Sequence, residues 1–267
     1  MPRELDGRRV LITGASSGIG EQLALAFARR GAHLALAARR QERLEEVATR
    51  CRTARGPAIV LPVDLGDTAA AADLGARALD ALGGIDVLIN NAGIPRRVHA
   101  GRLTFADIDE TMRVNYLGAM ALTMAVLPAM LEQRSGRIVN IGSIAGRLPA
   151  PREGAYAASK HALAAMSECM AIDLRGSGVS VHLVTPGVID TPLWQVPGQE
   201  ESPTSGDSRT PPGDVADAVL DLLRTGRFEA YVPARYRLPA VLKPLMGGAF
   251  LAGTARFDRR RVPEAHE

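Results

Sequence analysis

Lysine is nearly absent from this sequence. Of the 32 basic residues in 267, only Lys160 and Lys243 are lysines, so arginine carries almost all of the positive charge. With 29 acidic residues the net charge is only +3, and the arginines are spread along the chain, so nothing indicates a nucleic-acid partner. A chain that otherwise avoids lysine needs a chemical reason to keep one at position 160.

Cysteine and histidine are also scarce. The two cysteines, Cys51 and Cys169, provide neither a disulfide framework nor the spacing of metal ligands. The five histidines form no cluster in the sequence, and the H-E-x-x-H motif is missing. We therefore expect buried or idle thiols in a reducing compartment and no metal site.

The sequence has little room for a leader or a membrane span. Its first apolar run, residues 10–12, already opens a glycine-rich motif, so we expect no cleavable leader. We also expect no span, because no run of about 20 apolar residues stands out. These absences favour a cytoplasmic protein. With 46% apolar and 23% charged residues, the chain is long enough to bury the core of one domain.

Short aliphatic runs alternate with long helical stretches. The pattern predicts strands at residues 9–13, 33–38, 58–63, 85–89, 137–141, 179–184 and 228–232. It predicts helices at residues 19–30, 41–52, 69–82, 104–133, 155–175 and 214–223. This alternation is typical of an α/β fold of the Rossmann type, with a doubly wound parallel sheet of about seven strands and helices on both faces.

We place residues 1–267 in one dinucleotide-binding and catalytic domain with a core at about 7–232. Residues 194–213 are rich in Pro, Gly, Ser and acidic residues. They follow the sixth predicted strand, where ligands of such sheets bind, so we predict a substrate loop rather than a solvent loop without a role. Residues 233–267 form a C-terminal extension whose apolar run, 238–252, is broken by prolines and a lysine. One candidate role for this extension is contact with an acidic membrane surface. We favour a helical cap on the substrate pocket or a subunit contact.

A glycine-rich turn joins the first predicted strand to the first predicted helix. Its sequence, TGASSGIG, places Gly14, Gly18 and Gly20 in the pattern Gly-x-x-x-Gly-x-Gly. Glycine permits a tight turn and close approach to a pyrophosphate, and the helix N-terminus offers free N–H groups. Because a complete βαβ unit follows, we predict a dinucleotide site rather than glycines that serve only the turn.

The end of the second predicted strand distinguishes NAD from NADP. NAD-binding proteins place an acid there to bind the ribose 2′-OH, but this chain has Ala38 followed by Arg39 and Arg40. A guanidinium can bind a 2′-phosphate with two hydrogen bonds. We therefore predict NADP(H), with Arg39 as the main contact and Arg40 or Ser16 in support; a solvated arginine pair is the alternative. Asp64, after the third strand, suits the adenine amino group.

Tyr156 and Lys160 lie four residues apart on a predicted helix, so their side chains share one face. An unperturbed tyrosine has a pKa of about 10, which is too high for proton transfer at neutral pH, and a nearby ammonium lowers it. A compact ammonium fits beneath a ribose and beside a phenol, which the wide arginine fork does not. This requirement explains the retained lysine, although a Y-x-x-x-K pair is common by chance.

Three other features strengthen the pair. Ser143 follows a predicted strand thirteen residues before Tyr156, and its hydroxyl can bond the same substrate oxygen. The segment NNAG, residues 90–93, ends another strand beside the expected cofactor. Asn115 lies inside an apolar helix, where asparagine is unfavourable without a reason.

Together these segments resemble the single-domain short-chain dehydrogenase/reductase family. The resemblance covers roughly residues 7–232 and includes TGASSGIG at 13–20, NNAG at 90–93, YAASK at 156–160 and PGVIDT at 186–191. It implies an NADP(H)-dependent oxidoreductase that interconverts a carbonyl and a secondary alcohol. The missing acid after the second strand fits the family members that prefer NADP.

The resemblance also implies roles for the site residues. Ser143 would hold and polarise the substrate carbonyl, and Tyr156 would donate the proton in reduction or remove it in oxidation. Lys160 would bind the nicotinamide ribose and lower the pKa of Tyr156. Asn115 would help to hold a water that links Lys160 to solvent. The expected cofactor-binding residues, besides Tyr156 and Lys160, are Gly14, Ser16, Ser17, Gly18, Ile19, Gly20, Arg39, Arg40, Asp64, Leu65, Asn91, Ala92, Gly93, Pro186, Gly187, Val188, Ile189 and Thr191.

The expected substrate pocket is mostly apolar, which favours a hydrophobic small molecule. Its expected lining is Ile94, Ala145, Leu148, Ala150, Pro151, Leu193 and Trp194. Family members usually form dimers or tetramers through the long helices predicted here at 104–133 and 155–175. The alternative function is a non-catalytic, redox-responsive dinucleotide-binding regulator of the same fold, which would not need Ser143, Tyr156 and Lys160 together.

Overall fold

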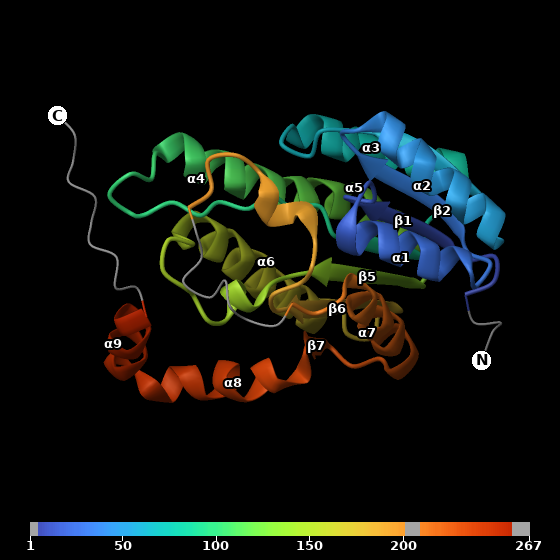
Figure 1. The fold of residues 1–267 in the computed structure, drawn as a ribbon. Helices are drawn as coiled ribbons and strands as arrows, with labels where there is room; N and C mark the ends of the chain where they lie inside the picture. Colours follow the sequence, from blue (N-terminus) through green and yellow to red (C-terminus); the bar gives the residue numbers. More distant parts are fainter. Residues whose placement is uncertain (1–4, 201–208, 258–267) are drawn as a thin grey trace.

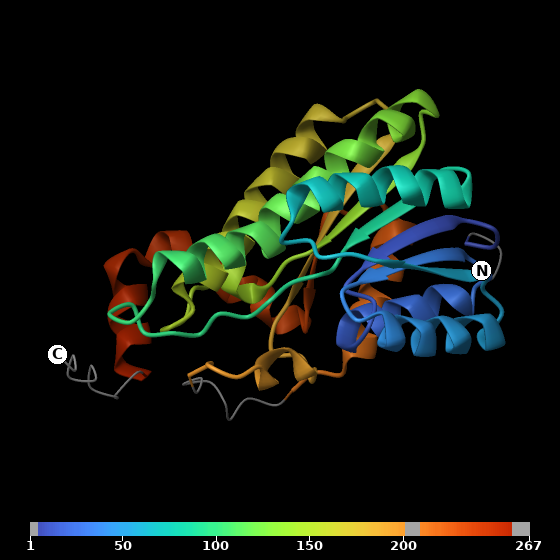
Figure 2. The same ribbon diagram turned by 90° about the horizontal axis from the view of Figure 1, so that it is seen from above.

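The computed structural model describes residues 5–200 and 209–257. Seven parallel strands form one sheet in the order β3-β2-β1-β4-β5-β6-β7, and helices cover both of its faces (Figures 1 and 2). The strands are β1 (Arg9–Thr13), β2 (His33–Ala38), β3 (Ala58–Pro62), β4 (Val87–Asn90), β5 (Gly136–Ile141), β6 (Val179–Pro186) and β7 (Glu229–Val232). The predicted Rossmann-type fold is confirmed.

The strand order reverses at β1, which pairs with β2 on one side and with β4 on the other. The chain builds outward from β1 to β3 and then returns to continue from β4. Connections therefore leave in opposite directions beyond the carboxyl ends of β1 and β4, which opens a crevice there. This crevice positions the candidate site.

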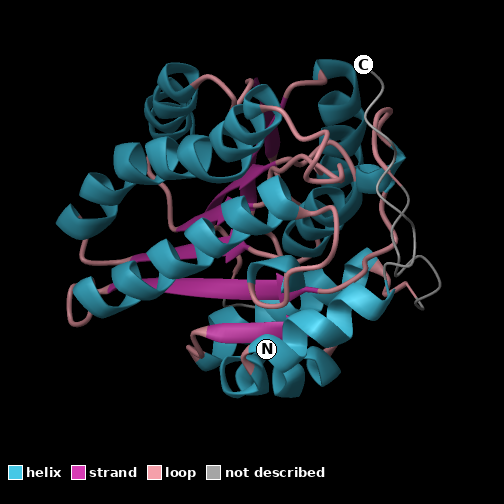
Figure 3. Cartoon of the chain, turned by 90° about the vertical axis from the view of Figure 1, so that its left-hand side faces the viewer, coloured by secondary structure: helices cyan, strands magenta, loops and turns pink. Residues whose placement is uncertain are grey.

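Two apolar layers sandwich the sheet, because alternate strand residues point to opposite faces. On β1, Val10 and Ile12 join the core beneath the first layer of helices, whereas Leu11 joins the core on the other face. The first layer contains α1 (Gly18–Ala28), α2 (Gln41–Ala54) and α7 (Pro212–Thr225). The second contains α3 (Thr68–Leu82), α5 (Gly118–Glu132) and α6 (Gly154–Asp173). Figure 3 shows the strands between these layers.

The helix expected at 104–133 is interrupted by a wider turn. Its first part, α4 (Phe105–Met112), begins with a capping box between Thr104 and Asp107. A π-helical turn, η1 (Arg113–Leu117), then leads directly into α5. Such turns insert one extra residue and often mark functional sites; this one contains Asn115, the residue that looked out of place in the sequence.

The helical segment Phe105–Glu132 is long and apolar enough to cross a membrane, with a mean hydropathy of 1.6 in its most apolar window. The expectation that no such segment exists was therefore wrong. Of that window, 44% is buried inside the protein, and α5 packs against α3. A core helix of an α/β domain meets the same test of length and composition.

The C-terminal extension is helical. A short turn, η4 (Ala234–Tyr236), follows β7 and leads into α8 (Arg237–Met246) and α9 (Gly248–Phe257). The axes of the two helical arms differ by 119°. Figure 1 shows α8 leading away from β7, with α9 at its far end.

Candidate active site

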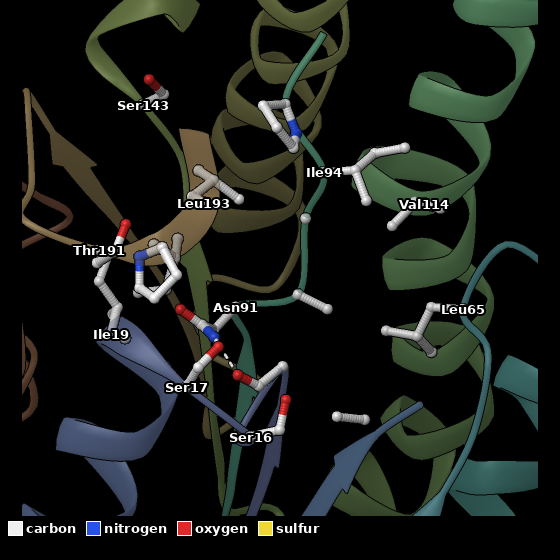
Figure 4. Close-up of a pocket in the computed structure, with 18 of the residues that line it drawn as sticks. Ser16, Ser17, Ile19, Leu65, Asn91, Ile94, Val114, Ser143, Thr191 and Leu193 are labelled. Atoms are coloured by element: carbon white, nitrogen blue, oxygen red, sulfur yellow. Dashed lines mark hydrogen bonds between the residues drawn. The ribbon is translucent and has the colours of Figure 1, made fainter. Parts of the chain in front are cut away.

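A cavity of about 460 Å³ lies at the carboxyl ends of the strands around β1 and β4. Its lining includes every residue predicted to bind the cofactor except Gly20 and Val188. In Figure 4, Ser16 and Ser17 lie at one end of the view and Ser143 at the other. The cavity thus joins the glycine-rich turn to the candidate catalytic residues.

The glycine-rich turn needs glycine for steric reasons. Gly14 has a φ of +64°, and a Cβ there would lie 2.8 Å from the Cα of Ala92. A Cβ on Gly20 would lie 2.2 Å from the carbonyl oxygen of Gly14. Gly20 therefore lets α1 pack against the turn and does not line the cavity, so its predicted contact with the cofactor stays a prediction.

The N-terminus of α1 faces this turn. The helix begins at Gly18, and within the described chain the N-cap residue Ser17 makes no capping hydrogen bond with its side chain. The first N–H groups of α1 therefore stay available to an anion, and the helix dipole favours a negative charge. The bare backbone at Gly14 and the available helix N-terminus fit the pyrophosphate of a nicotinamide dinucleotide.

Hydrogen bonds tie the ends of β1 and β4 together beneath the cavity. The hydroxyl of Thr13 accepts from the backbone N–H groups of Asn91 and Ala92, at 3.0 and 3.1 Å. In return, the Asn91 amide donates to the carbonyl of Thr13 at 2.9 Å. These bonds fix the floor on which a cofactor would rest. Our site prediction omitted Thr13, although it opens the TGASSGIG segment.

The two arginines after β2 differ in their contacts. Arg40 Nη2 donates to the hydroxyls of Ser16 and Ser17, at 3.2 and 3.1 Å. Arg39 is exposed, lines the cavity, and makes no ion pair or hydrogen bond within the described part of the chain. Asp64, on the same rim, accepts from the N–H of Gly66 at 2.9 Å. Arg39 is therefore the cation most accessible to a phosphate, while Arg40 organises the serines.

Ser143, Tyr156 and Lys160 meet where β5 ends against α6. The phenol of Tyr156 is hydrogen-bonded to the side chain of Ser143. The ammonium of Lys160 lies 6.0 Å from the centroid of the Tyr156 ring and donates to the carbonyl of Ile141 at 2.9 Å. All three residues line the cavity. The structure thus brings together the three residues predicted to act on a carbonyl.

The pKa of Tyr156 is shifted upward, whereas the sequence suggested a downward shift. Burial raises the pKa of Tyr156 to about 12, although the hydrogen bond with Ser143 acts in the other direction. Burial also lowers the pKa of Lys160 to about 8. The predicted lowering of the tyrosine pKa by Lys160 is therefore wrong for this structure. The reason is desolvation, which penalises the phenolate and the ammonium alike.

Asn115 acts on the backbone rather than in the cavity. From the π-turn its Oδ1 accepts from the N–H of Ile94 at 2.7 Å, and its Nδ2 donates to the carbonyl of Ile94 at 3.0 Å. The same Nδ2 donates to the Ser159 hydroxyl at 3.0 Å. Asn115 is fully buried and does not line the cavity. It clamps the chain after β4 beside the helix that carries Tyr156 and Lys160.

The expected substrate lining is only partly present. Ile94 and Leu193 line the cavity, whereas Ala145, Leu148, Ala150 and Pro151 do not. The chain turns away after Ser143 in a 3₁₀ turn, η2 (Ile144–Gly146), which packs against α6. The side chain of Trp194 lies outside the described residues. Apolar lining residues that the sequence reasoning missed are Val63, Pro95, Val114, Ile141, Pro192 and Val196.

Val188 also lies outside the cavity lining, and its predicted contact with the cofactor stays a prediction. Its carbonyl accepts from the N–H of Thr210 at 2.9 Å, where an isolated bridge joins Ile189 to Thr210. The backbone of this segment thus closes the base of the substrate loop, while Ile189 and Thr191 face the cavity.

An ion-pair network beside the cavity was not predicted. The nearly buried side chains of Arg97 and Glu153 form an ion pair at 2.7 Å. Glu153 lies three residues before Tyr156 in the sequence. Glu200, in the predicted substrate loop, pairs with Arg102 at 2.6 Å and with Arg152 at 3.3 Å. The first pair joins the described start of the loop to the segment after β4, and the second joins it to the turn before α6. Single charged residues far apart in the sequence give no signal for such a network.

The family model described as short chain dehydrogenase matches residues 8–202, which is most of the chain and includes the glycine-rich turn, Ser143, Tyr156 and Lys160. The chain belongs to the short-chain dehydrogenase/reductase family. The match covers the residues that form the cavity up to the described start of the substrate loop.

Relatives of this short-chain dehydrogenase/reductase include two proteins that are named as reductases of acyl compounds. It is 36% identical to "Ketoacyl reductase HetN" of Nostoc sp. over 85% of this chain and 79% of that protein. It is 41% identical to "Fatty acyl-CoA reductase" of Acinetobacter baylyi and 42% identical to "Dehydrogenase/reductase SDR family protein 7-like" of Anopheles gambiae. These two alignments cover 70% and 72% of this chain, and 64% and 62% of those proteins.

Solved structures of this family resemble the dehydrogenase and contain different dinucleotides. A short-chain dehydrogenase/reductase from Burkholderia phymatum in complex with NAD is 25% identical, with a TM-score of 0.80 and 99% coverage of both chains. A metagenomic short-chain oxidoreductase in complex with NADP is 32% identical, with a TM-score of 0.73 and coverage of 85% of this chain and 96% of that one. A nicotinamide dinucleotide is thus the cofactor class, and either member fits the fold.

Proposed function

We propose that this short-chain dehydrogenase/reductase is an NADP(H)-dependent enzyme that interconverts a carbonyl and a secondary alcohol on a hydrophobic small molecule. The observation that carries the proposal is the meeting of Ser143, Tyr156 and Lys160 in the cavity that begins at the glycine-rich turn. A regulator that only senses the dinucleotide would need the turn but not this trio.

NADP rather than NAD is supported by the residues after β2. No acid follows the strand to bind a ribose 2′-OH, and the exposed guanidinium of Arg39 lies on the cavity rim. Arg40 holds the hydroxyls of Ser16 and Ser17 near the same rim. A 2′-phosphate would thus meet one accessible cation and hydroxyls held in place by the other.

The proposed chemistry divides between cofactor and protein. NADPH, when bound, supplies the hydride for reduction. Ser143 orients the substrate by donating a hydrogen bond to its carbonyl oxygen. Tyr156, whose high pKa keeps the phenol protonated, gives its proton to that oxygen as negative charge develops there. Lys160 holds the nicotinamide ribose with its ammonium.

A hydrophobic substrate is supported by apolar side chains in the same cavity lining. They include Ile94, Val114 and Leu193, which Figure 4 labels, and also Val196. Two relatives have names that describe reductases of acyl compounds, which supports a carbonyl on an aliphatic chain and the reductive direction.

The Tyr156→Phe variant tests the proposal. We expect NADPH binding to change less than about threefold and turnover with a hydrophobic ketone to fall by 10² or more, because general acid catalysis contributes about 10²–10⁴. Fluorescence titration measures binding, and NADPH consumption measures turnover. Retention of most turnover by this variant would show that Tyr156 is not the acid.

A further inference from the structure

The C-terminal extension presents an apolar stripe to solvent. On α8, the stripe consists of Leu238, Val241, Leu242, Leu245 and Met246, which are 42–83% exposed. Spacings of three and four residues place these side chains on one side of a helix. In a globular protein such a stripe normally faces the core, and here neither α8 nor α9 lines the cavity. The cap on the substrate pocket, one of the two roles we favoured for the extension, therefore stays a prediction.

The charged side chains of the extension within residues 230–257 are all positive. Residues 230–257 contain no aspartate or glutamate but four basic residues, Arg235, Arg237, Lys243 and Arg256. Arg237 opens α8 and is exposed. Lys243 lies 5.8 Å from the centroid of the Phe250 ring, where a cation–π contact joins α8 to α9. Exposed leucines beside Arg235, Arg237 and Lys243, which make no ion pair within the described residues, suit a surface that is both apolar and anionic.

The dimensions of the extension exclude a conventional span. Ten residues of helix extend about 15 Å, half of the roughly 30 Å of hydrocarbon in a bilayer. The 119° bend between the two arms prevents them from acting as one straight helix. Short amphipathic helices with a basic border lie instead in the interfacial plane of a membrane.

A second copy of the chain is a poorer partner for this surface. In a two-fold symmetric contact the same patch lies on both sides. The cations of one extension would then share the contact with the cations of the other, with no acid in residues 230–257 of either copy to compensate. Anionic lipid headgroups provide that compensation.

We propose that α8 and α9 dock this protein on the surface of a membrane that contains anionic phospholipid. The extension begins beside the cavity, because the ring of Tyr236 lies within 2.1 Å of the position a Cβ on Gly187 would take, and Gly187 lines the cavity. Docking would therefore bring the cavity wall at Gly187 close to the lipid. This inference concerns adsorption and does not depend on the proposed function, because the test below needs no turnover.

The test is co-sedimentation of the full-length protein with vesicles of phosphatidylcholine and phosphatidylglycerol, or of phosphatidylcholine alone. We expect binding to the anionic vesicles at low salt, weaker binding to neutral vesicles, and loss of binding as salt increases. Leu245→Glu should weaken binding roughly tenfold or more, whereas Leu245→Met, which keeps the apolar area, should bind like the parent.

The charge is tested with a matched pair of variants. Arg237→Glu should weaken binding roughly tenfold, because it changes two charges at the surface. Arg43→Glu makes the same charge change on α2, in the first layer of helices, and should leave binding unchanged. Circular dichroism melts confirm that each variant is folded.

Three results would overturn the proposal. One is no binding to anionic vesicles at low salt. Another is equal binding by the Leu245→Glu variant and the parent. The third is a parent protein that does not bind vesicles, together with light scattering that shows a smaller mass for Leu245→Glu than for the parent. The stripe would then be a subunit contact.

Discussion

At the scale of single residues, Arg39 and Arg40 show how similar side chains take different roles. Arg40 is held by two serine hydroxyls, so it shapes the turn at which a phosphate would bind. Arg39 lines the cavity without such a contact in the described chain. The proposed preference for NADP therefore depends mainly on Arg39.

Arg39→Asp should weaken NADPH binding by roughly tenfold or more, because it replaces a phosphate contact with a repulsive charge. NADH binding should change little, since NADH has no 2′-phosphate. Paired titrations with the two cofactors measure the difference. Arg43→Asp, the same charge change on α2, serves as the control. Equal weakening of both cofactors would remove Arg39 from the 2′-phosphate site.

We expect Lys160 to make cofactor binding sensitive to pH. Burial lowers its pKa to about 8 from an ordinary value of 10.5, so its ammonium is present below pH 8 and is lost as the pH rises through that value. An uncharged amine binds ribose hydroxyls less well than an ammonium does.

We therefore expect the dissociation constant of NADPH to increase severalfold between pH 7 and pH 9.5. Lys160→Met should bind weakly at both values and show a smaller change, because it lacks the titrating group. Titrations of both proteins in one buffer series measure this. An equal pH dependence in the variant would assign the effect to another group.

At the scale of the element, the π-turn between α4 and α5 connects local structure to the site. It places the Asn115 amide on the backbone of Ile94, so one side chain satisfies both an N–H and a carbonyl after β4. The sequence identified the unusual residue but not the turn. A π-turn depends on which backbone bonds form, and side-chain periodicity does not reveal them.

Asn115→Leu should lower the free energy of unfolding by about 1–3 kcal/mol, because it leaves buried polar groups of Ile94 without partners. Turnover should also fall, since Ile94 lines the cavity. Urea denaturation and steady-state kinetics measure the two effects. Arg113→Gln, an exposed change in the same turn, should alter stability by less than about 1 kcal/mol. An Asn115→Leu protein as stable as the parent would contradict this role.

At the scale of the whole molecule, the outer surface of the second helical layer suggests assembly. Large apolar side chains are exposed on α4, α5 and α6, including Phe105, Met124 and Ile172. Exposed apolar area of this kind marks interaction surfaces. It lies on the helices through which the family resemblance implies dimers or tetramers.

We expect a solution mass that is a multiple of 28.3 kDa, as a dimer or tetramer. Met124→Glu combined with Ile172→Glu should shift the mass toward the monomer, because each places a charge in the contact. Size-exclusion chromatography with light scattering measures the mass. A monomeric parent at micromolar concentration would refute the expectation.

Much of the architecture could be predicted because it follows from periodic patterns. Alternating apolar runs and helical stretches gave the strands nearly at their observed positions, and TGASSGIG located the crevice. The orientation of Lys160 toward the Ile141 carbonyl could not be predicted, nor could the pairing of Arg97 with Glu153. Burial and distant partners create these features, and neither leaves a local pattern. The high pKa of Tyr156 could not be predicted for the same reason, because it results from burial.

The placement of the two lysines makes the fold easy to monitor by proteolysis. The bond after Lys243 precedes Pro244, an imide bond that most proteases cut poorly. The bond after Lys160 lies within the ordered helix α6, and the Lys160 side chain is only 4% exposed. A lysine-specific protease should therefore produce one main cut, into residues 1–160 and 161–267, and only when α6 opens. The rate of that cut with and without NADPH would show whether the cofactor stabilises α6.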